Sequence, residues 1–283
     1  MTALDRRLNA FRDDLADVRL RGRIEAPRFA AGRRARVAAP LAGLRRLPDE
    51  NLAHDTELLF GDEVTVFDET DGWCWVQAAR DGYVGYCRAS ALGPIEAAPT
   101  HVVSAPRTWR YERPDLKGRA VDALSLGSSL TIGDFVEHRG TRYAVAADGT
   151  AVVAGHLRPV DRHIDDYVAA AELLAGTPYL WGGATAFGID CSGLVQLAMR
   201  MTGRDVLRNS DMQAATIGAP IDPAEGLQRG DLVFWKGHVA ILTAAAGVIH
   251  ANGHTMLVSA EPLAQAVERI GYLYGQPTGY RRP

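Results

Sequence analysis

The pattern of hydrophobic and polar residues changes near Val160, and the two sides of this position predict different architectures. Before it, short runs of alternating apolar and polar residues are separated by Asp-Gly turns, a pattern typical of β-strands joined by tight turns. Strands are expected at residues 64–66, 73–76, 83–87, 130–132, 143–146 and 151–154. Short strands with frequent turns indicate small all-β barrels.

Two parts of this β-rich region match each other when the chain is compared with itself. At an offset of 66 residues, five identical pairs occur: Val37 and Val103, Pro40 and Pro106, Pro48 and Pro114, Leu58 and Leu124, and Gly61 and Gly127. The Asp-Gly turn at 81–82 matches the turn at 148–149 at an offset of 67, as a one-residue loop insertion would produce. Such matches indicate a duplicated unit of about 60 residues. We therefore predict domains at residues 35–96 and 97–161, after an N-terminal extension at residues 1–34.

Residues 162–283 show helical spacing first and strand patterns afterwards. A helix is expected at residues 164–175, ended by Gly176 and Pro178, and a second at residues 191–202, ended by Gly203. Strands are expected at residues 231–235, 238–242 and 248–251. Helices followed by an antiparallel meander predict an α+β domain, preceded here by two small all-β domains.

Composition limits the partners and the location of the chain. Its 283 residues are 47% hydrophobic and 23% charged, which suits two or three soluble globular units. A formal net charge of −3 and the lack of a long basic run argue against nucleic acid or membrane as a partner held by bulk electrostatics. We find no apolar stretch that suits a signal peptide or a membrane span. A cytoplasmic location is therefore expected.

The three cysteines, Cys74, Cys87 and Cys191, are too few and too unevenly spaced for a disulfide framework or a four-thiolate metal site. Cys74 and Cys87 lie in predicted strands, where a buried, small hydrophobic residue is the ordinary interpretation. Reduced thiols also fit the cytoplasm.

Cys191 stands in a different setting from the other two. Asp190 can cap the second predicted helix, which places Cys191 in its first turn. Free backbone N–H groups and the helix dipole favour an anion there, so the thiol should ionise more readily than usual. On this stretch alone, a core cysteine that happens to begin a helix is an equally good interpretation.

His238 and His250 are twelve residues apart, on two strands that should form an antiparallel hairpin. Such a hairpin brings the two imidazoles close together, as in a general base held by an orienting partner. A single histidine on a strand is more often a structural residue. The catalytic interpretation therefore requires Cys191 to lie near this pair.

Three runs in this order, YLWGGATAFGIDCSGLVQ, GDLVFWKGHVAIL and GVIHANG, resemble the NlpC/p60 branch of papain-like cysteine peptidases over residues 165–283. The run LLFGDEVTVFDETDGWCWVQAARDGYVGYCRASAL resembles a bacterial SH3-like domain, and the second unit resembles a weaker copy. The resemblance implies that Cys191 is the nucleophile, His238 the base and His250 its orienting partner. It also implies that Tyr179 supports the thiol and the oxyanion.

Members with two SH3-like domains resemble the murein-recycling type, a γ-D-glutamyl-L-diamino acid endopeptidase acting on short peptides with a free N-terminal L-Ala. The resemblance implies such a murein-derived peptide substrate and no cofactor. That type has an Arg-Asp-Ser run where this chain has Arg208-Asn209-Ser210, so the residue that meets the amine brings no charge. The substrate-binding residues that we expect are Asp190, Ser192, Asn209, Ser210, Glu57 and Tyr83.

Three alternatives accompany this interpretation. His250 and His254 have the spacing of a helical zinc motif, but Ala-Asn-Gly between them indicates a turn and no Glu follows the first His, so no metal is expected. A wall-binding module that has lost activity would also carry two SH3-like domains. A related acyltransferase would have its histidine before its cysteine, whereas Cys191 comes first here.

Overall fold

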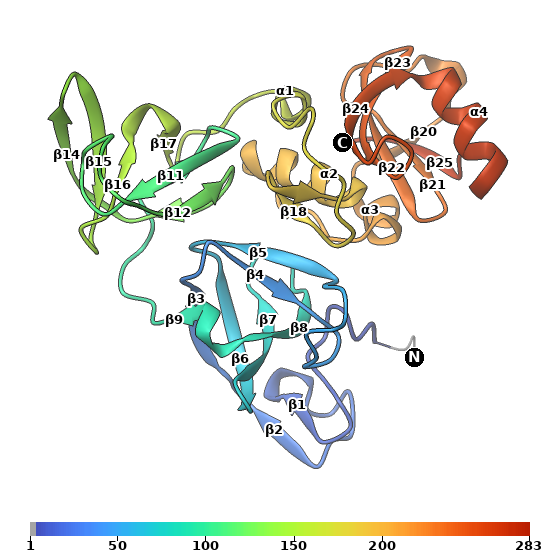
Figure 1. Cartoon of the computed structure of the whole chain (residues 1–283). Helices are drawn as coiled ribbons and strands as arrows, with labels where there is room; N and C mark the ends of the chain where they lie inside the picture. The colour runs from blue at the N-terminus through green and yellow to red at the C-terminus, as the bar shows by residue number, and fades with distance from the viewer. Residues whose placement is uncertain (1–3) are drawn as a thin grey trace. The chain divides into compact units, whose positions relative to one another are not determined.

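The computed structural model describes residues 4–283, which divide into two compact units (Figure 1). One unit ends at Arg162, and the other runs from His163 to Pro283. Among the described residues, all α-helices lie in the second unit, and the first is built from strands and short 3-10 turns. The predicted change from all-β to mixed structure is therefore present.

The first SH3-like domain consists of two sheets. The five-stranded sheet has the order β8-β7-β6-β3-β9, and β4 pairs with β5. The bounds are β3 Arg33–Val37, β4 Leu41–Leu44, β5 Thr56–Leu59, β6 Glu63–Thr70, β7 Trp73–Ala78, β8 Val84–Arg88 and β9 Leu92–Gly93. Alternate residues of these strands, including Val64, Val66 and Val76, form one buried core. The strand pairing does not close into a single barrel, which the sequence had suggested.

The second β-rich part, residues 97–161, shares several strand pairings with the first, but its strands form a three-stranded sheet, β13-β10-β17, and a five-stranded sheet, β12-β11-β16-β15-β14. Its strands are β10 His101–Val103, β11 Arg107–Tyr111, β12 Ala120–Ser125, β13 Ser129–Leu130, β14 Ile132–His138, β15 Thr141–Ala146, β16 Ala151–Val153 and β17 Leu157–Pro159. β10 pairs with β13 and β17 as β3 pairs with β6 and β9, and β11 pairs with β12 as β4 pairs with β5. These shared pairings agree with the repeat seen in the sequence, while the two domain ranges stay a prediction. These sheets do not close into one barrel either.

Two glycines matched by the repeat occupy the same backbone conformation. Gly61 has φ 87° and Gly127 has φ 83°, in the left-handed region that side chains disfavour. The matched turns agree as well, since the carboxylates of Asp81 and Asp148 each accept a hydrogen bond from the N–H two residues later. The matched glycines and the matched Asp-Gly turns thus have the same local geometry in both parts.

The N-terminal segment is folded against the first domain. It contains the short parallel strands β1 (Leu15–Asp17) and β2 (Arg28–Ala30). Leu15 is 3% exposed and forms a hydrophobic cluster with Phe67 and Trp75. The guanidinium of Arg12 lies 4.9 Å from the ring centre of Trp75 and pairs with Asp68. Phe67 and Trp75 alternate along β6 and β7 with the residues of the main core, so they lie on the other face of the sheet. The N-terminal segment covers this second apolar face.

Cys74 and Cys87 are direct neighbours on the paired strands β7 and β8. Both are completely buried, and burial raises the pKa of Cys74 to about 11 and that of Cys87 to about 12. Their predicted role as buried hydrophobic residues is confirmed.

The second unit has a six-stranded sheet in the order β20-β25-β21-β22-β23-β24. The strands are β20 Ala219–Ile221, β21 Leu232–Trp235, β22 His238–Ala244, β23 Gly247–Asn252, β24 Leu257–Pro262 and β25 Gly279–Arg282, with a small hairpin of β18 Ala184–Thr185 and β19 Gly188–Ile189. The helices are α1 Tyr167–Glu172, α2 Cys191–Met201, α3 Ser210–Thr216 and α4 Leu263–Tyr274. The predicted meander is β21 to β23, whereas β20, β24, β25, α3 and α4 were not predicted.

Helix packing on this sheet follows the alternation of its side chains. Ala240 and Leu242 of β22 form a core with Ala266 and Ile270 of α4. The intervening residue Val239 is completely buried and points to the other face, where α2 packs against β22. The first residue of α2 is Cys191 and the first of β22 is His238, so this packing determines where both lie.

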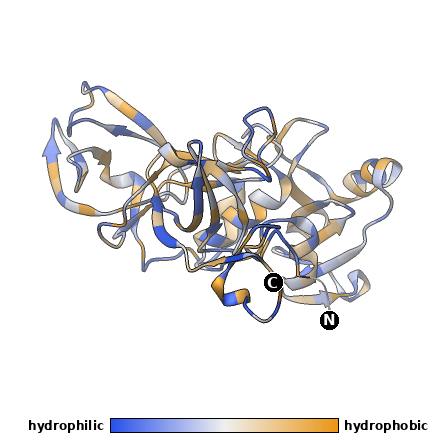
Figure 2. Ribbon diagram, turned by 90° about the horizontal axis from the view of Figure 1, so that it is seen from below, coloured by the Kyte–Doolittle hydropathy of each residue, from blue (hydrophilic) through white to orange (hydrophobic). Residues whose placement is uncertain are grey.

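No helix within residues 4–283 is long and apolar enough to cross a membrane. The helices carry hydrophobic and hydrophilic positions together, as the colours of Figure 2 show.

Leu15→Ala should lower the free energy of unfolding of the chain by about 2–5 kcal/mol, because it opens a cavity between the N-terminal segment and the first domain. Urea unfolding followed by fluorescence measures this change. Leu47→Ala is the control, since Leu47 is 55% exposed and its truncation should change stability by less than about 0.5 kcal/mol. Equal stability of the two variants would contradict the packing described for the segment.

Candidate active site

The start of α2 is fixed by an N-cap. Asp190 has extended backbone geometry, and its Oδ1 accepts a hydrogen bond from the N–H of Gly193 at 2.7 Å. Cys191 is the first helical residue and is 7% exposed. The predicted helix boundary and its cap are both confirmed.

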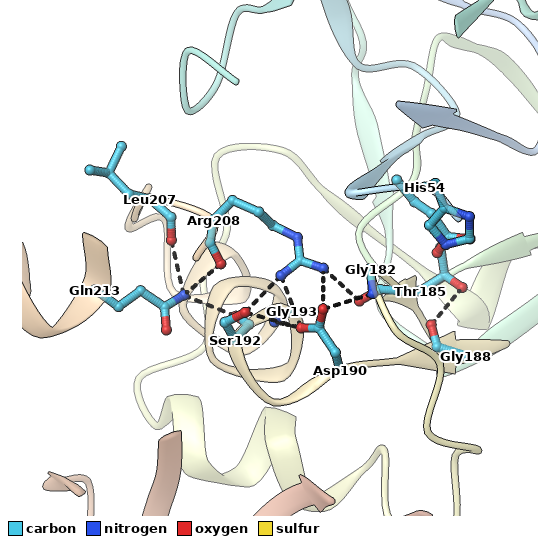
Figure 3. Close-up of polar contacts among 12 residues, drawn as sticks. His54, Gly182, Thr185, Gly188, Asp190, Ser192, Gly193, Leu207, Arg208 and Gln213 are labelled. Carbon is cyan, nitrogen blue, oxygen red and sulfur yellow. Dashed lines mark hydrogen bonds and ion pairs between the residues drawn. The ribbon is translucent and has the colours of Figure 1, made fainter. Parts of the chain in front are cut away.

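A buried arginine, which sequence reasoning noted only as a neighbour of Asn209, holds this helix start in place. Arg208 is completely buried, and its guanidinium donates to both carboxylate oxygens of Asp190 at 2.9 and 2.7 Å. It also donates to Oγ of Ser192 at 2.8 Å and to the carbonyl of Gly183 at 3.1 Å (Figure 3). Residue type alone does not distinguish a buried arginine from the usual exposed one. Arg208 therefore ties together the glycine loop, which contains Gly182 and Gly183, the N-cap Asp190 and the first turn of α2.

Helix α3 is joined to the same structure through Gln213. Its Nε2 donates to the carbonyl of Ser192 and to that of Leu207, each at 2.9 Å (Figure 3). Gln213 is completely buried. The segment that contains Asn209 is thereby positioned relative to the first turn of α2.

His238 and His250 form the predicted pair. Nε2 of His238 lies 2.8 Å from Nδ1 of His250, and the ring centres are 5.1 Å apart. His250 is completely buried, and its Nε2 lies 2.8 Å from Oε1 of Glu261. Burial lowers the pKa of His238 to about 3 and that of His250 to about 4. Both imidazoles are therefore neutral near pH 7.

The thiol of Cys191 lies beside β22. The backbone N–H of Val239, the residue after His238, interacts with its sulfur, as does the N–H of Ser192. Burial nevertheless raises the pKa of Cys191 to about 12, and the carboxylate of Asp190 acts in the same direction. The prediction of a readily ionised thiol is wrong for the resting site, because removal from water outweighs the helix end.

Tyr179 is positioned by its backbone. Its N–H donates to the carbonyl of Met256 at 2.8 Å, and it forms an isolated bridge with Ile189. Burial raises the pKa of its phenol, and the nearby Cys191 and Asp190 add to this shift. The hydroxyl is therefore protonated near neutral pH and can donate a hydrogen bond in the vicinity of Cys191.

The residues expected to bind substrate fall into three groups. The side chains of Asp190 and Ser192 bond to each other and to Arg208, which gives both a positioning role. Asn209 precedes α3, and its Oδ1 is buried with no hydrogen-bond partner among residues 4–283. Ser210 is the first residue of α3 and is half-buried. Direct contact of any of these side chains with substrate stays a prediction.

Glu57 and Tyr83 belong to the N-terminal unit. Glu57 lies on β5, is 8% exposed, and has its Oε1 3.5 Å from Nε2 of His54. Tyr83 lies in the core cluster of the first SH3-like domain. Substrate binding by these two residues also stays a prediction.

The geometry bears on the alternative metal site as well. Both ring nitrogens of His250 are taken by His238 and Glu261, so neither is left for a metal. His254 lies in the turn between β23 and β24, where its N–H donates to Oδ1 of Asn252.

Comparison with known proteins gives matches in both units. Residues 44–92 match the bacterial dipeptidyl-peptidase SH3 domain, and residues 176–269 match the NlpC/P60 family. Dipeptidyl-peptidase 6 of Lysinibacillus sphaericus is 27% identical, over 84% of this chain and 98% of that protein. Gamma-D-glutamyl-L-lysine dipeptidyl-peptidase of Bacillus cereus is 27% identical, over 74% of this chain and 70% of that protein.

Among solved structures, an NlpC/P60 family protein from Bacillus cereus is similar with a TM-score of 0.73 and 22% identity, over 88% of this chain and 99% of that one. This likeness concerns the fold. The chain therefore combines a bacterial dipeptidyl-peptidase SH3 domain with an NlpC/P60 domain, and the predicted α+β, NlpC-type fold is confirmed.

Arg208→Met should lower the free energy of unfolding by about 3–5 kcal/mol, because it leaves the buried carboxylate of Asp190 without its partner. Urea unfolding measures the loss. Arg229→Met is a matched control that removes an exposed arginine paired with Asp166 and Glu172, and it should cost about 1 kcal/mol or less. Similar losses for both variants would contradict the role given to Arg208.

Proposed function

We propose that this chain, which carries an NlpC/P60 domain after a bacterial SH3 domain, is a cysteine peptidase that hydrolyses the γ-D-glutamyl-diamino acid bond of short murein peptides. The observation that carries the proposal is the 2.8 Å contact between His238 and His250 at the strand end beside Cys191. Relatives named gamma-D-glutamyl-L-lysine dipeptidyl-peptidase, at 27% identity, support the substrate class.

In the proposed mechanism His238 acts through Nδ1, because its Nε2 is taken by His250. As the thiol of Cys191 attacks the γ-carbonyl carbon of the D-glutamyl residue, its proton passes to this nitrogen. The imidazolium then donates the proton to the amine of the diamino acid as the C–N bond breaks. Water hydrolyses the thioester, with His238 again accepting a proton, and restores the thiol.

The neutral resting pair suits this sequence of steps. Burial raises the pKa of Cys191 and lowers that of His238, so the proton stays on sulfur until the substrate is attacked. Negative charge then develops on the carbonyl oxygen. The backbone N–H of Cys191, at the start of α2, and the protonated hydroxyl of Tyr179 are the proposed donors to this oxyanion.

The free N-terminal amine of the substrate is the proposed partner of Asn209. Oδ1 of Asn209 is a buried acceptor that has no partner in the described part of the chain, and a protonated amine is a strong donor. Ser210, the first residue of α3, is the second proposed member of this amine site. Only released peptides have this amine free, since glycan-linked stem peptides use it in an amide bond. The proposed setting is therefore murein recycling in the cytoplasm.

Cys191→Ala should abolish hydrolysis of an L-Ala-γ-D-Glu-L-Lys tripeptide, because it removes the nucleophile. His238→Ala should lower kcat by about 10²–10⁴-fold, the usual contribution of a general base. His250→Ala should have a smaller effect, since His250 acts through His238. Product formation measured by mass spectrometry tests the series, with circular dichroism to confirm folding. Full turnover by folded Cys191→Ala would overturn the proposed mechanism.

N-acetylation of the tripeptide should lower kcat/KM by at least about tenfold, because a charged hydrogen bond to the amine is lost. The Asn209→Ala variant is the control, and it should discriminate less between the free and the acetylated peptide. Equal rates of the unmodified protein on both peptides, or release of peptides from purified sacculi, would contradict the recycling role.

The acid limb of the kcat/KM profile should lie well below pH 6.5, the ordinary pKa of histidine. Burial lowers the pKa of His238 to about 3, so the base is still neutral in mildly acidic solution and is lost only as the pH falls further. Activity near pH 5.5 should exceed about half of its value at pH 7. A limb centred at about pH 6.5 or higher would show that His238 titrates as an exposed imidazole. The apparent pKa values belong to the coupled pair.

A further inference from the structure

The hydrogen-bonded pair of histidines continues into a third side chain that the sequence did not indicate. Oε1 of Glu261 lies 2.8 Å from Nε2 of His250 and also accepts from the guanidinium of Arg269 on α4. Glu261 lies on β24 opposite Val248 of β23, two positions along from the partner of His250. A long side chain reaches a diagonal neighbour at this spacing.

The carboxylate of Glu261 cannot donate a hydrogen bond, and this determines the direction of the hydrogen bonds that join His238, His250 and Glu261. A carboxylate paired with a guanidinium is an acceptor only, so Nε2 of His250 carries the proton and donates it to Glu261. Neutral His250 then has a lone pair on Nδ1, which accepts from Nε2–H of His238. In neutral His238, Nδ1 is therefore unprotonated.

We propose that Glu261 is a positioning residue of the active site, whose carboxylate fixes the proton of His250 on Nε2 and so keeps Nδ1 of His238 free to accept the proton of Cys191. This inference rests on the proposed function of His238 as the base. Arg269 holds the carboxylate in place from α4. Without Glu261, His250 could carry its proton on Nδ1, where it would meet the proton on Nε2 of His238.

Glu261 also contributes charge to the step in which His238 becomes cationic. The groups that act on His238 by charge are His250 and Arg269, which disfavour its protonation, and Asp190 and Glu261, which favour it. Glu261 and Arg269 line a surface pocket together with His254, Glu268 and Tyr272, so the far end of the series reaches solvent. Loss of the Glu261 charge should therefore make the imidazolium form of His238 less stable.

Two variants of Glu261 separate its effect on the tautomer of His250 from its effect on the charge of His238. Glu261→Gln keeps an oxygen that can accept from His250 but removes the charge, whereas Glu261→Ala removes both. Glu268→Gln is the matched control, because it removes one negative charge from the same pocket and lies outside the hydrogen-bonded series. Ring nitrogen shifts of ¹⁵N-labelled histidine at pH 7 report the tautomer of His250, and hydrolysis of the tripeptide reports kcat and KM.

We expect unmodified protein, Glu268→Gln and Glu261→Gln to show His250 protonated on Nε2 only, and Glu261→Ala to lose this single state. Glu261→Ala should lower kcat by about 10–100-fold with KM changed by less than about twofold. Glu261→Gln should lower kcat less and move the acid limb of kcat/KM to lower pH, because the charge that favours protonated His238 is gone.

The single Nε2–H state in Glu261→Ala, with kcat within about twofold of Glu268→Gln, would overturn the proposal. If Glu261→Ala does not fold, an unchanged acid limb in Glu261→Gln would overturn it. The tautomer is measured without substrate. An inactive unmodified protein with the expected tautomers would therefore contradict the proposed function and leave the positioning role of Glu261 supported.

Discussion

The buried ion pair of Arg208 and Asp190 is the contact on which the geometry around Cys191 depends. A charged side chain with no exposed surface is stable only when its donors are satisfied, and the guanidinium meets two carboxylate oxygens, a hydroxyl and a carbonyl. Because these partners come from a glycine loop, a helix cap and the first turn of α2, none of the three can move alone. Cys191, the proposed nucleophile, is thus held by a network in which its own side chain takes no part.

A second constraint is the removal of the reactive groups from water. Burial acts against the thiolate of Cys191 and against the imidazolium of His238, so it favours the uncharged pair at rest. In the proposed mechanism, charge separates only when Cys191 attacks the carbonyl of a substrate, and the groups around Cys191 and His238 then act on both charges. The N–H groups of Val239 and Ser192 favour the thiolate, while Asp190 and Glu261 favour the imidazolium. The same burial that disfavours these ions strengthens the interactions that stabilise them.

The sequence predicted those features that depend on local pattern. Asp190 and Gly203 determine the ends of α2, and the strand alternation around His238 and His250 brings the imidazoles together. Arg208 and Glu261 were missed as members of the site, because their importance comes from burial and from partners on other elements. The pKa shift of Cys191 was predicted in the wrong direction for the same reason. The helix end, which lowers the pKa, can be read from the sequence, whereas the burial that raises it depends on tertiary packing.

In the proposed function, the uncharged amide of Asn209 selects for an amine. Its Oδ1 is buried and has no partner among the residues that the structure describes, which is unfavourable in the free protein. A ligand that brings a donor removes this penalty, whereas a ligand without one leaves the oxygen unpaired and desolvated. Selectivity for an amine then arises largely because a ligand without a donor leaves Oδ1 of Asn209 unpaired. An amide oxygen imposes this penalty on any ligand without a donor, but it separates a charged amine from a neutral N–H less strongly than a carboxylate does.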